Sequence, residues 1–534
     1  MKEKLTMIEL FSGIGAQKRG TDLTGLFNCE VIATSDIDKE ATVSYAAIHN
    51  GLTNELIDTY ENYPSEEDMK KELIDKNIGI DLKKGTNPIA RLKGKRLKRY
   101  WLAMKISNNL GDISKITQLP YADLWTNSFN CQDLSVAGKQ KGMVYICGDC
   151  NTEWEMSFDK DKDIRICPNC NSSNLKSTRS GLLKQVERLL EVAQETNTLP
   201  KYLLLENVKN LVGKKHKSQF DDWINRLDEL GFNTYWQVLN GKNCGIPQNR
   251  ERVFAISIRK DVDTGLFDFP KPFDVGYRLR DFLEDEVDEK YYLSQEVQDR
   301  LQITDDTFTK SIVGTTKPEF RTIGQRDLVY QKDSVMGALV ATDYKQPKQI
   351  LEDSNELKQA MTLSGGKWDK INESCRRVYS EDGIAPTLHT CGGGNTEAKV
   401  VFEERRDEGV RLFKGDYVGT LRTIDACGDK RVAENIGGKR RVRKLTPTEA
   451  FRLMGFRDED IDKCYDLKVS DSQLYKQSGN SIITNCIALL MEHLYKAQYD
   501  NTYVATDERI LSKIEKMEKE MSKGTENFTQ PQVV

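Results

Sequence analysis

The chain has 534 residues, of which 38% are hydrophobic and 30% are charged, and a formal net charge of −4 at pH 7. This composition excludes a largely disordered chain, and the slight acidic excess gives no support for nucleic-acid binding outside local basic patches. No window approaches the roughly 18 apolar residues of a membrane span, and the N-terminus lacks the apolar run of a signal peptide. The twelve cysteines are therefore expected in a reducing, cytoplasmic compartment, as thiols for metal binding or chemistry.

The first 50 residues predict a strand, a glycine-rich turn, a helix, a second strand and a second helix. The strands are Thr6–Phe11 and Val31–Ser35, the turn is "SGIGA", and the second helix is Ile37–His49. Such a turn alone is as often an ordinary tight turn. Asp36 follows the second strand directly, however, at the place where a carboxylate commonly binds ribose hydroxyls. The combination favours a cofactor that contains adenosine.

Residues 50–108 interrupt this alternation of strands and helices. An acidic stretch, Glu66–Glu72, precedes a basic one from Lys83 to Lys105 that holds nine Lys and Arg residues and no Asp or Glu. With Tyr100 and Trp101 beside it, the basic stretch is compatible with tracking a phosphate backbone. A solvated surface insertion explains it equally well.

Cys131 lies in "TNSFNCQDLSVAGKQKGM", among small and polar residues that are unsuited to burial. A structural cysteine is usually a small buried hydrophobe. The surroundings of Cys131 therefore predict an exposed thiol that is available for chemistry.

Two CxxC pairs follow, formed by Cys147 with Cys150 and by Cys167 with Cys170, and 16 residues separate the pairs. This spacing is typical of a zinc ribbon, and four thiolates would leave no open catalytic position on the metal. Reduced unpaired thiols or redox cysteines are the alternatives. Because four thiolates would close the coordination sphere, we expect the metal to be structural. Because the ribbon directly follows the Cys131 stretch, we also expect it to touch the molecule on which Cys131 acts.

Further strands and helices continue the α/β pattern after the ribbon. Tyr202–Leu205 is a buried strand, Phe220–Leu230 an amphipathic helix, and a further strand runs from near Asn233 to Gly241. Strands that alternate with helices imply a mostly parallel sheet, which binds ligands at the carboxyl ends of its strands.

Glu206 comes directly after the Tyr202–Leu205 strand, where apolar surroundings raise a carboxyl pKa and suit it to donate a proton. A turn residue at a strand end is the structural alternative. Arg250 and Arg252, in "GIPQNRER", are expected on one face of a strand, suited either to an anion or to surface ion pairs.

From about 280 to 440 the chain is rich in strands and turns. "GALVAT" at 337, "APTLHT" at 385 and "GTLRT" at 419 share a core of small residues with threonine, which indicates related units in a separate domain. Near the C-terminus, apolar residues on one face of 505–524 predict an amphipathic helix.

Eight motifs occur in an order that resembles the DNA (cytosine-5) methyltransferase family and span about residues 6–490: "ELFSGIG", "LGDI", "NCQDLSVAGKQKG", "TRSGLL", "LENV", "GIPQNRERVF", "RKLTPTEAFRLMGF" and "YKQSGNSI". The resemblance implies the Rossmann-like fold of S-adenosylmethionine-dependent methyltransferases. It also implies a monomer that methylates cytosine at a specific site in double-stranded DNA, with a restriction nuclease as a possible companion.

The resemblance implies a role for each site residue. The residues expected to bind S-adenosyl-L-methionine are Phe11, Gly13, Gly15, Asp36, Ile37, Asp112, Ile113, Asn480 and Ser481. Cys131 is the expected nucleophile toward carbon 6 of cytosine, Glu206 contacts ring nitrogen 3, and Arg252 stabilises the adduct while Arg250 supports the loop or a phosphate. The target base must be flipped out of the duplex. The residues expected to contact DNA are Gln132, Ser135, Lys139, Gln140, Arg377, Thr387 and Thr390.

The implied organisation is a catalytic domain with two interruptions. Its first part is 1–143, the zinc ribbon 144–176 with structural Zn²⁺, and its second part 177–280. A target recognition domain at 281–440, catalytic completion at 441–500, and a helix and tail at 501–534 follow. The typical family member lacks the ribbon and has proline where this chain has Asn130. Methylation of cytosine in RNA, modified chemistry on the same carbon, and a base-flipping binder without catalysis are the alternatives.

Overall fold

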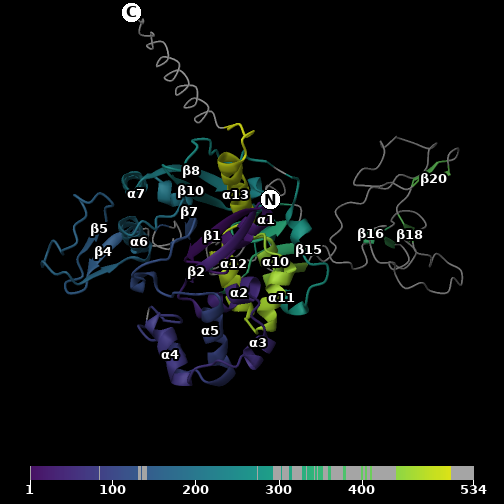
Figure 1. The fold of residues 1–534 in the computed structure, drawn as a ribbon. Helices are drawn as coiled ribbons and strands as arrows, with labels where there is room; N and C mark the ends of the chain where they lie inside the picture. The colour runs from purple at the N-terminus through teal and green to yellow at the C-terminus, as the bar shows by residue number, and fades with distance from the viewer. Residues whose placement is uncertain are drawn as a thin grey trace, which may run out of the picture. The chain divides into compact units, whose positions relative to one another are not determined.

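The computed structural model describes residues 2–82, 84–129, 134, 141–273, 275–292, 302–303, 312–315, 328–331, 334–341, 343–345, 347–352, 359–362, 377–379, 399–400, 403–405, 409–411 and 441–506 (Figure 1). No helix within these ranges is long and apolar enough to cross a membrane. The chain divides into two compact units. Unit 1 consists of 1–286, 333–347 and 445–534, and unit 2 of 287–332 and 348–444.

Unit 1 is built on a six-stranded sheet with the order β2-β1-β3-β7-β10-β8. Neighbouring strands from β2 to β7 run parallel, and β10 runs antiparallel to both β7 and β8, so the sheet is mixed. The strands are β1 (Glu3–Leu10), β2 (Phe27–Ser35), β3 (Leu124–Asn127), β7 (Tyr202–Val208), β8 (Phe232–Asn240) and β10 (Glu251–Arg259).

Two predictions made for this sheet are wrong in detail. The strand β7 does not end at Leu205 but continues through Glu206 to Val208, because β10 pairs with it there, with Phe254 opposite Glu206. Arg250 does not share a strand with Arg252, because it lies between the short strand β9 (Gln248–Asn249) and β10. The backbone N–H of Arg250 donates to the Asn240 side chain at this break.

Apolar side chains on one face of the sheet, such as Leu10, Trp125 and Leu205, form a core with the helices α6 (Leu183–Glu195) and α7 (Lys217–Glu229). Elsewhere in unit 1, α1 (Ala16–Leu23) packs against α13 (Thr484–Tyr499), as Figure 1 shows. Their approach is close, since a Cβ on Gly20 would lie 2.5 Å from Ile487 Cβ. The C-terminal helices α10 (Pro447–Arg452), α11 (Asp458–Asp466), α12 (Asp471–Asn480) and α13 thus complete the unit that the N-terminus begins.

Residues 50–108, here called the helical insertion, contain α3 (Asn54–Thr59), α4 (Glu66–Asp75) and α5 (Gly94–Ile106), and α5 packs against α2 (Lys39–Asn50). Tyr100 and Trp101 are buried, so neither side chain is available to stack on nucleic-acid bases. Cations of the basic stretch pair with carboxylates, as in Lys95–Asp58 and Lys105–Glu72. The described residues therefore support a packed insertion.

The ribbon (residues 144–176) contains the small sheet β5-β4-β6, formed by β4 (Val144–Cys147), β5 (Glu153–Glu155) and β6 (Leu175–Ser177). Both pairings are antiparallel, and Thr178 returns the chain to the start of β4 by donating its N–H to the Val144 carbonyl.

The described parts of unit 2 contain mainly short strands, beside the 3-10 helix Glu289–Tyr291. One sheet has the order β11 (Gln302–Ile303), β12 (Ile312–Thr315), β13 (Leu328–Gln331), β15 (Gln349–Glu352) and β21 (Arg441–Lys444). The others are β16 (Gln359–Thr362) with β17 (Arg377–Tyr379) and β18 (Lys399–Val400), and β19 (Glu403–Arg405) with β20 (Gly409–Arg411). Within unit 1, β14 (Met336–Gly337) pairs with β9. The repeats at 385 and 419 and nearly all of the expected 505–524 helix lie outside the described residues.

Candidate active site

The backbone of the turn after β1, residues 11–15, leaves an open space beside it, here called the cradle. Phe11, Gly13 and Gly15 all have positive φ, at 59°, 52° and 79°. Nothing lies within 4 Å of a Cβ built on Gly13, whereas a Cβ on Gly15 would lie 2.3 Å from His49 Nε2. Gly13 therefore leaves room for a ligand. Gly15 was expected to bind the cofactor, but it does not line the cavity. Its lack of a side chain instead makes room for His49 of α2.

Asp36 closes the other side of this cradle. Its two carboxylate oxygens accept the N–H groups of Gly13 at 2.9 Å and of Asp38 at 2.7 Å. Burial, and then the neighbouring Asp38 carboxylate, raises the pKa of Asp36 to about 6. Lys476 from α12 pairs with Asp38 at 2.5 Å, and that cation opposes the rise. The Asp36 carboxylate is thereby oriented by the backbone and left facing the cavity.

A buried acid that was not among the predicted site residues lies beneath the turn. Glu9, in β1, is fully buried and accepts the N–H of Lys18 in the first turn of α1 and the hydroxyl of Tyr45. Burial raises the pKa of Glu9 to about 7. The signal that was available was an acid inside an apolar strand, since such a charge is found only where hydrogen bonds compensate it. Glu9 holds the beginning of α1 against the strand, and so fixes the turn.

The cradle opens into a cavity of about 370 Å³ in unit 1. One wall comes from the turn and the ends of the first two strands, and the other from β7, the segment around Arg250 and the end of α12. The expected site residues that line the cavity are Phe11, Gly13, Asp36, Ile37, Asp112, Ile113, Glu206, Arg250, Arg252, Asn480 and Ser481. The fold thus brings the expected cofactor residues and the expected catalytic carboxyl to one space.

Glu206 projects into this cavity from within β7 and is only 7% exposed. Desolvation raises its pKa, and the charges of Arg252 and Arg250 oppose the rise. Arg252 Nε lies 3.2 Å from Glu206 Oε1. A carboxyl that is both desolvated and held by a guanidinium is suited to hydrogen-bond to a ring nitrogen and to hold its proton.

Arg250 is buried and binds the backbone. Its guanidinium donates to the carbonyls of Leu339, Gly479 and Ser481, at 2.6 to 3.1 Å. It therefore fixes the end of α12, where Asn480 and Ser481 line the cavity, to the loop before β10. Of the two roles that the sequence suggested for Arg250, these bonds are compatible with support of the loop.

Cys131, Gln132, Ser135, Lys139, Gln140, Thr387 and Thr390 lie outside the described residues, as does Asn130. Arg377 begins β17 in unit 2. Two described residues of the Cys131 stretch, Phe129 and Leu134, are buried and are held by the segment after Glu206. Asn207 Nδ2 donates to the Phe129 carbonyl at 2.9 Å, and Asn210 Nδ2 donates to the Leu134 carbonyl at 2.5 Å.

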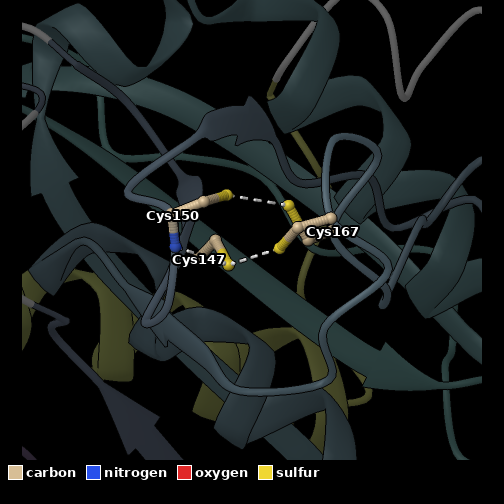
Figure 2. A group of neighbouring side chains, drawn as sticks. Cys147, Cys150 and Cys167 are labelled. Carbon is tan, nitrogen blue, oxygen red and sulfur yellow. Dashed lines mark hydrogen bonds between the residues drawn. The ribbon is translucent and has the colours of Figure 1, made fainter.

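The four cysteines of the ribbon converge, with all four Sγ atoms within 4.8 Å of one another. Figure 2 shows the side chains of Cys147, Cys150 and Cys167 pointing toward one another. Cys147 Sγ lies 3.5 Å from Cys170 Sγ, and Cys150 Sγ lies 3.5 Å from Cys167 Sγ. Tetrahedral zinc with Zn–S bonds of about 2.3 Å would separate its sulfurs by about 3.8 Å, so the donor set and spacing fit zinc.

The two cysteine turns share one backbone pattern. Asn151 and Asn171 each follow the second cysteine of a pair and have φ of 59° and 56°. In each turn this asparagine donates its N–H to the carbonyl of the first cysteine of its pair. The N–H groups of Asp149 and Cys150 also approach Cys147 Sγ, at 3.4 and 3.5 Å. Backbone donors aimed at sulfur favour a thiolate, which is the form that binds metal.

The base of the ribbon is fastened to α6 and α7. Phe158 packs on Trp223, with ring centroids 5.1 Å apart. Lys184 of α6 is buried between Asp163, at 3.1 Å, and Glu187, at 2.7 Å. The ribbon itself carries four Lys and Arg residues and six Asp and Glu residues. Of the four cations, Lys160, Lys162 and Arg165 pair with carboxylates, so the charge of the ribbon does not favour phosphate binding.

The known proteins that are similar to this chain are methyltransferases. The model of the family described as C-5 cytosine-specific DNA methylase matches residues 170–496. Orphan methyltransferase M.SPBetaI of Bacillus phage SPbeta is 30% identical, with 92% of this chain and 97% of that protein aligned. Type II methyltransferase M2.ScrFI of Lactococcus lactis subsp. cremoris is 29% identical, with 92% and 100% aligned. Type II methyltransferase M.HhaI of Haemophilus parahaemolyticus is 24% identical, with 71% and 77% aligned.

Proposed function

The chain belongs to the C-5 cytosine-specific DNA methylase family and is a DNA (cytosine-5) methyltransferase. We propose how its residues carry out the reaction. The proposal rests on one observation. The cavity that Gly13 and Asp36 line is also lined by Glu206. A methyl donor bound at the cradle and a cytosine held by Glu206 would share this space.

S-adenosyl-L-methionine, the cofactor of this family, fits the cavity on chemical grounds. The carboxylate of Asp36 is oriented to accept ribose hydroxyls, and Gly13 lets the backbone approach a ligand closely. Ile37 and Ile113 add apolar wall for a purine, and Asn480 and Ser481 close the pocket from the C-terminal side. When bound, the cofactor supplies an electrophilic methyl group.

Glu206 and Arg252 act on the cytosine ring. Glu206, with its raised pKa, shares a proton with ring nitrogen 3 and so withdraws charge from the ring. Arg252 keeps the carboxyl in place and stabilises the negative charge that develops. Arg250 acts indirectly, by fixing the backbone around Asn480 and Ser481.

Cys131 is the nucleophile of the proposed mechanism. Its thiolate adds to carbon 6, the S–C6 bond forms, and the electrons of the C5–C6 double bond make carbon 5 nucleophilic. After carbon 5 has gained the methyl group, a base removes its proton, the double bond returns, and the thiolate leaves. Because these atoms are inaccessible in a stacked duplex, the cytosine is flipped out. Gln132, Ser135, Lys139 and Gln140, on the same stretch, contact the DNA in this proposal.

The ribbon holds one structural Zn²⁺ through Cys147, Cys150, Cys167 and Cys170, supported by the fit of the four sulfurs. The ribbon follows the Cys131 stretch in the sequence, and we propose on this ground that it contacts DNA. Its charge gives no support for that contact, because the ribbon has no excess of positive charge.

The substrate is double-stranded DNA at a specific site, with unit 2 as the target recognition domain through Arg377, Thr387 and Thr390. The enzyme acts as a monomer in this proposal, and a cognate restriction nuclease remains a possible companion.

The test is incubation with S-adenosylmethionine tritiated in the methyl group and, in parallel, with mixed-sequence duplex DNA or with total RNA, followed by nucleoside analysis. We expect label in 5-methylcytosine with the wild-type enzyme and none with Cys131→Ser, which keeps its affinity for DNA. Glu206→Gln is expected to lower kcat by roughly 100-fold or more. Label in RNA alone, or full activity of Cys131→Ser, would contradict the proposed mechanism.

A further inference from the structure

The helical insertion reaches the cofactor cavity at residues 76–87. The N–H of Gly79 donates to the Ile37 carbonyl at 2.7 Å, and the N–H of Asp112 donates to the Lys76 carbonyl at 2.9 Å. Asn77 Nδ2 adds a bond to Asp112 Oδ2 at 2.7 Å. Both Ile37 and Asp112 line the cavity, so this segment is tied to two of its walls.

The segment forms a tight turn in which one apolar residue, Leu82, precedes two lysines in the sequence. Asp81 and Thr86 form a bridge, and the Asp81 carbonyl accepts the N–H of Gly85 at 2.8 Å. Within the turn, Leu82 lines the cavity and yet is 54% exposed. A single exposed leucine needs no explanation on an ordinary surface. At the edge of a ligand cavity, it is apolar surface that a bound ligand would cover.

The insertion holds this turn firmly in place. Ile78 and Ile89, on either side of the turn, are fully buried. The Asn87 side chain donates to the Ile78 carbonyl at 3.0 Å, and a Cβ on Gly79 would lie 3.0 Å from Ile89. Leu82 is therefore presented to the cavity by a supported backbone, which reduces the ordering cost of binding.

We propose that Leu82 is a cofactor-binding residue that covers the adenosine end of the ligand, and that the helical insertion is in part a wall of the cofactor site. The inference rests on the proposed function of this cavity. Leu82, Ile37 and Ile113 are among the apolar residues that line the cavity, and the turn is bonded between Ile37 and Asp112. Apolar walls suit the flat purine, while the charged amino-acid end of the ligand needs polar partners.

The test measures binding of two probes to the full-length protein by calorimetry. S-adenosylhomocysteine has both ends of the ligand, whereas 5′-methylthioadenosine has the adenosine end without the amino acid. We expect Leu82→Ala to weaken both probes by the same factor, about five- to tenfold, because the lost contact lies at the end that they share. Leu82→Met should retain most of the affinity, and the Kd for DNA should not change.

Leu23→Ala is the matched control, because Leu23 is a partly exposed leucine of unit 1 outside the cavity lining, and neither probe should be affected. Asn77→Gly, which keeps the positive φ of that residue at no steric cost and removes the bond to Asp112, should weaken both probes less than Leu82→Ala. Unchanged affinities in Leu82→Ala, or a loss confined to S-adenosylhomocysteine, would overturn the inference. A wild-type protein that binds neither probe would instead overturn the proposed function of the cavity, and the inference with it.

Discussion

The helical insertion and the ribbon interrupt the same catalytic unit, but they bury different side chains. The insertion buries Met69, Leu73, Leu97, Tyr100 and Trp101 among its helices and against α2. Between its first and last cysteines, the ribbon buries four side chains, of which Met156 and Phe158 belong to the core with α6 and α7. The other two are Cys147 and Cys167, while Ile164 and Ile166 are more than half exposed.

We infer that apolar burial stabilises the helical insertion, whereas the ribbon would depend on a metal held by its four cysteines. A segment that cannot bury enough apolar surface needs a metal or another crosslink to fold. The two insertions should therefore respond in opposite ways to removal of metal and to truncation of apolar side chains.

The largest effect is expected on removing the metal. Binding at structural zinc sites in small peptides amounts to about 10–16 kcal/mol, and here it would be coupled to folding of the ribbon tip. Cys167→Ser should lower the zinc content, measured by mass spectrometry, from about one per chain to near zero. Limited proteolysis should then cleave between residues 147 and 172 while residues 50–108 stay protected. Cys29→Ser, outside the cluster, should retain the zinc, and retention by Cys167→Ser would contradict the assignment.

Truncation of apolar side chains should affect the helical insertion more than the ribbon, the reverse of the effect of metal removal. Trp101→Ala removes a buried side chain from the helical insertion, with the indole bond to Glu72, and should lower the free energy of unfolding by about 3–5 kcal/mol. Ile164→Ala in the ribbon should change it by less than about 0.5 kcal/mol, because that side chain is exposed. Urea unfolding of both variants measures the difference. Equal losses would show that the ribbon has an apolar core of its own.

Ion pairs give a third contrast, between the base of the ribbon and the surface of the insertion. Lys184→Met removes the buried cation that Asp163 and Glu187 share, while Arg165 and Arg226 still pair with these carboxylates, and should cost about 2 kcal/mol. Lys95→Met removes the exposed pair with Asp58 and should cost no more than about 1 kcal/mol. The same unfolding measurement compares them. A small cost for Lys184→Met would mean that apolar packing such as Phe158 on Trp223 suffices to fasten the ribbon.

Local patterns predicted much of the fold and of the site. The first two strands, the turn, Asp36 and the convergence of four cysteines follow from residues close in sequence. The structure adds what depends on distant partners. β7 continues past Leu205 because β10 pairs with it, and Arg250 leaves the strand at a break held by Asn240. The place of Leu82 in the cavity depends on bonds to Ile37 and Asp112, which no spacing in the helical insertion indicates.

The smallest expected effect is a pH dependence of ligand affinity at the cavity. The helical insertion borders this cavity and the ribbon does not. The ionised form of Asp36 accepts the N–H groups of Gly13 and Asp38 and is the form suited to ribose hydroxyls. Because its pKa is raised to about 6, protonation as the pH falls through 6 should weaken binding of S-adenosylhomocysteine. The affinity should be about fourfold lower at pH 5.5 than at pH 7.5, from the ionised fractions alone.

The stability contribution of Asp36 has the opposite sign. A raised pKa in the folded state means that this contribution is fully present below the ordinary carboxyl pKa of 3.8 and is lost as the pH rises through about 6. Loss of affinity at low pH is therefore not a consequence of unfolding at Asp36. Calorimetry should show the pH dependence in wild-type protein and not in Asp36→Asn. It should also persist in zinc-depleted protein, because the ribbon contributes no residue to the cavity lining. A profile that disappears with the zinc would mean that the ribbon supports the cofactor site, and the contrast between the two insertions would fail there.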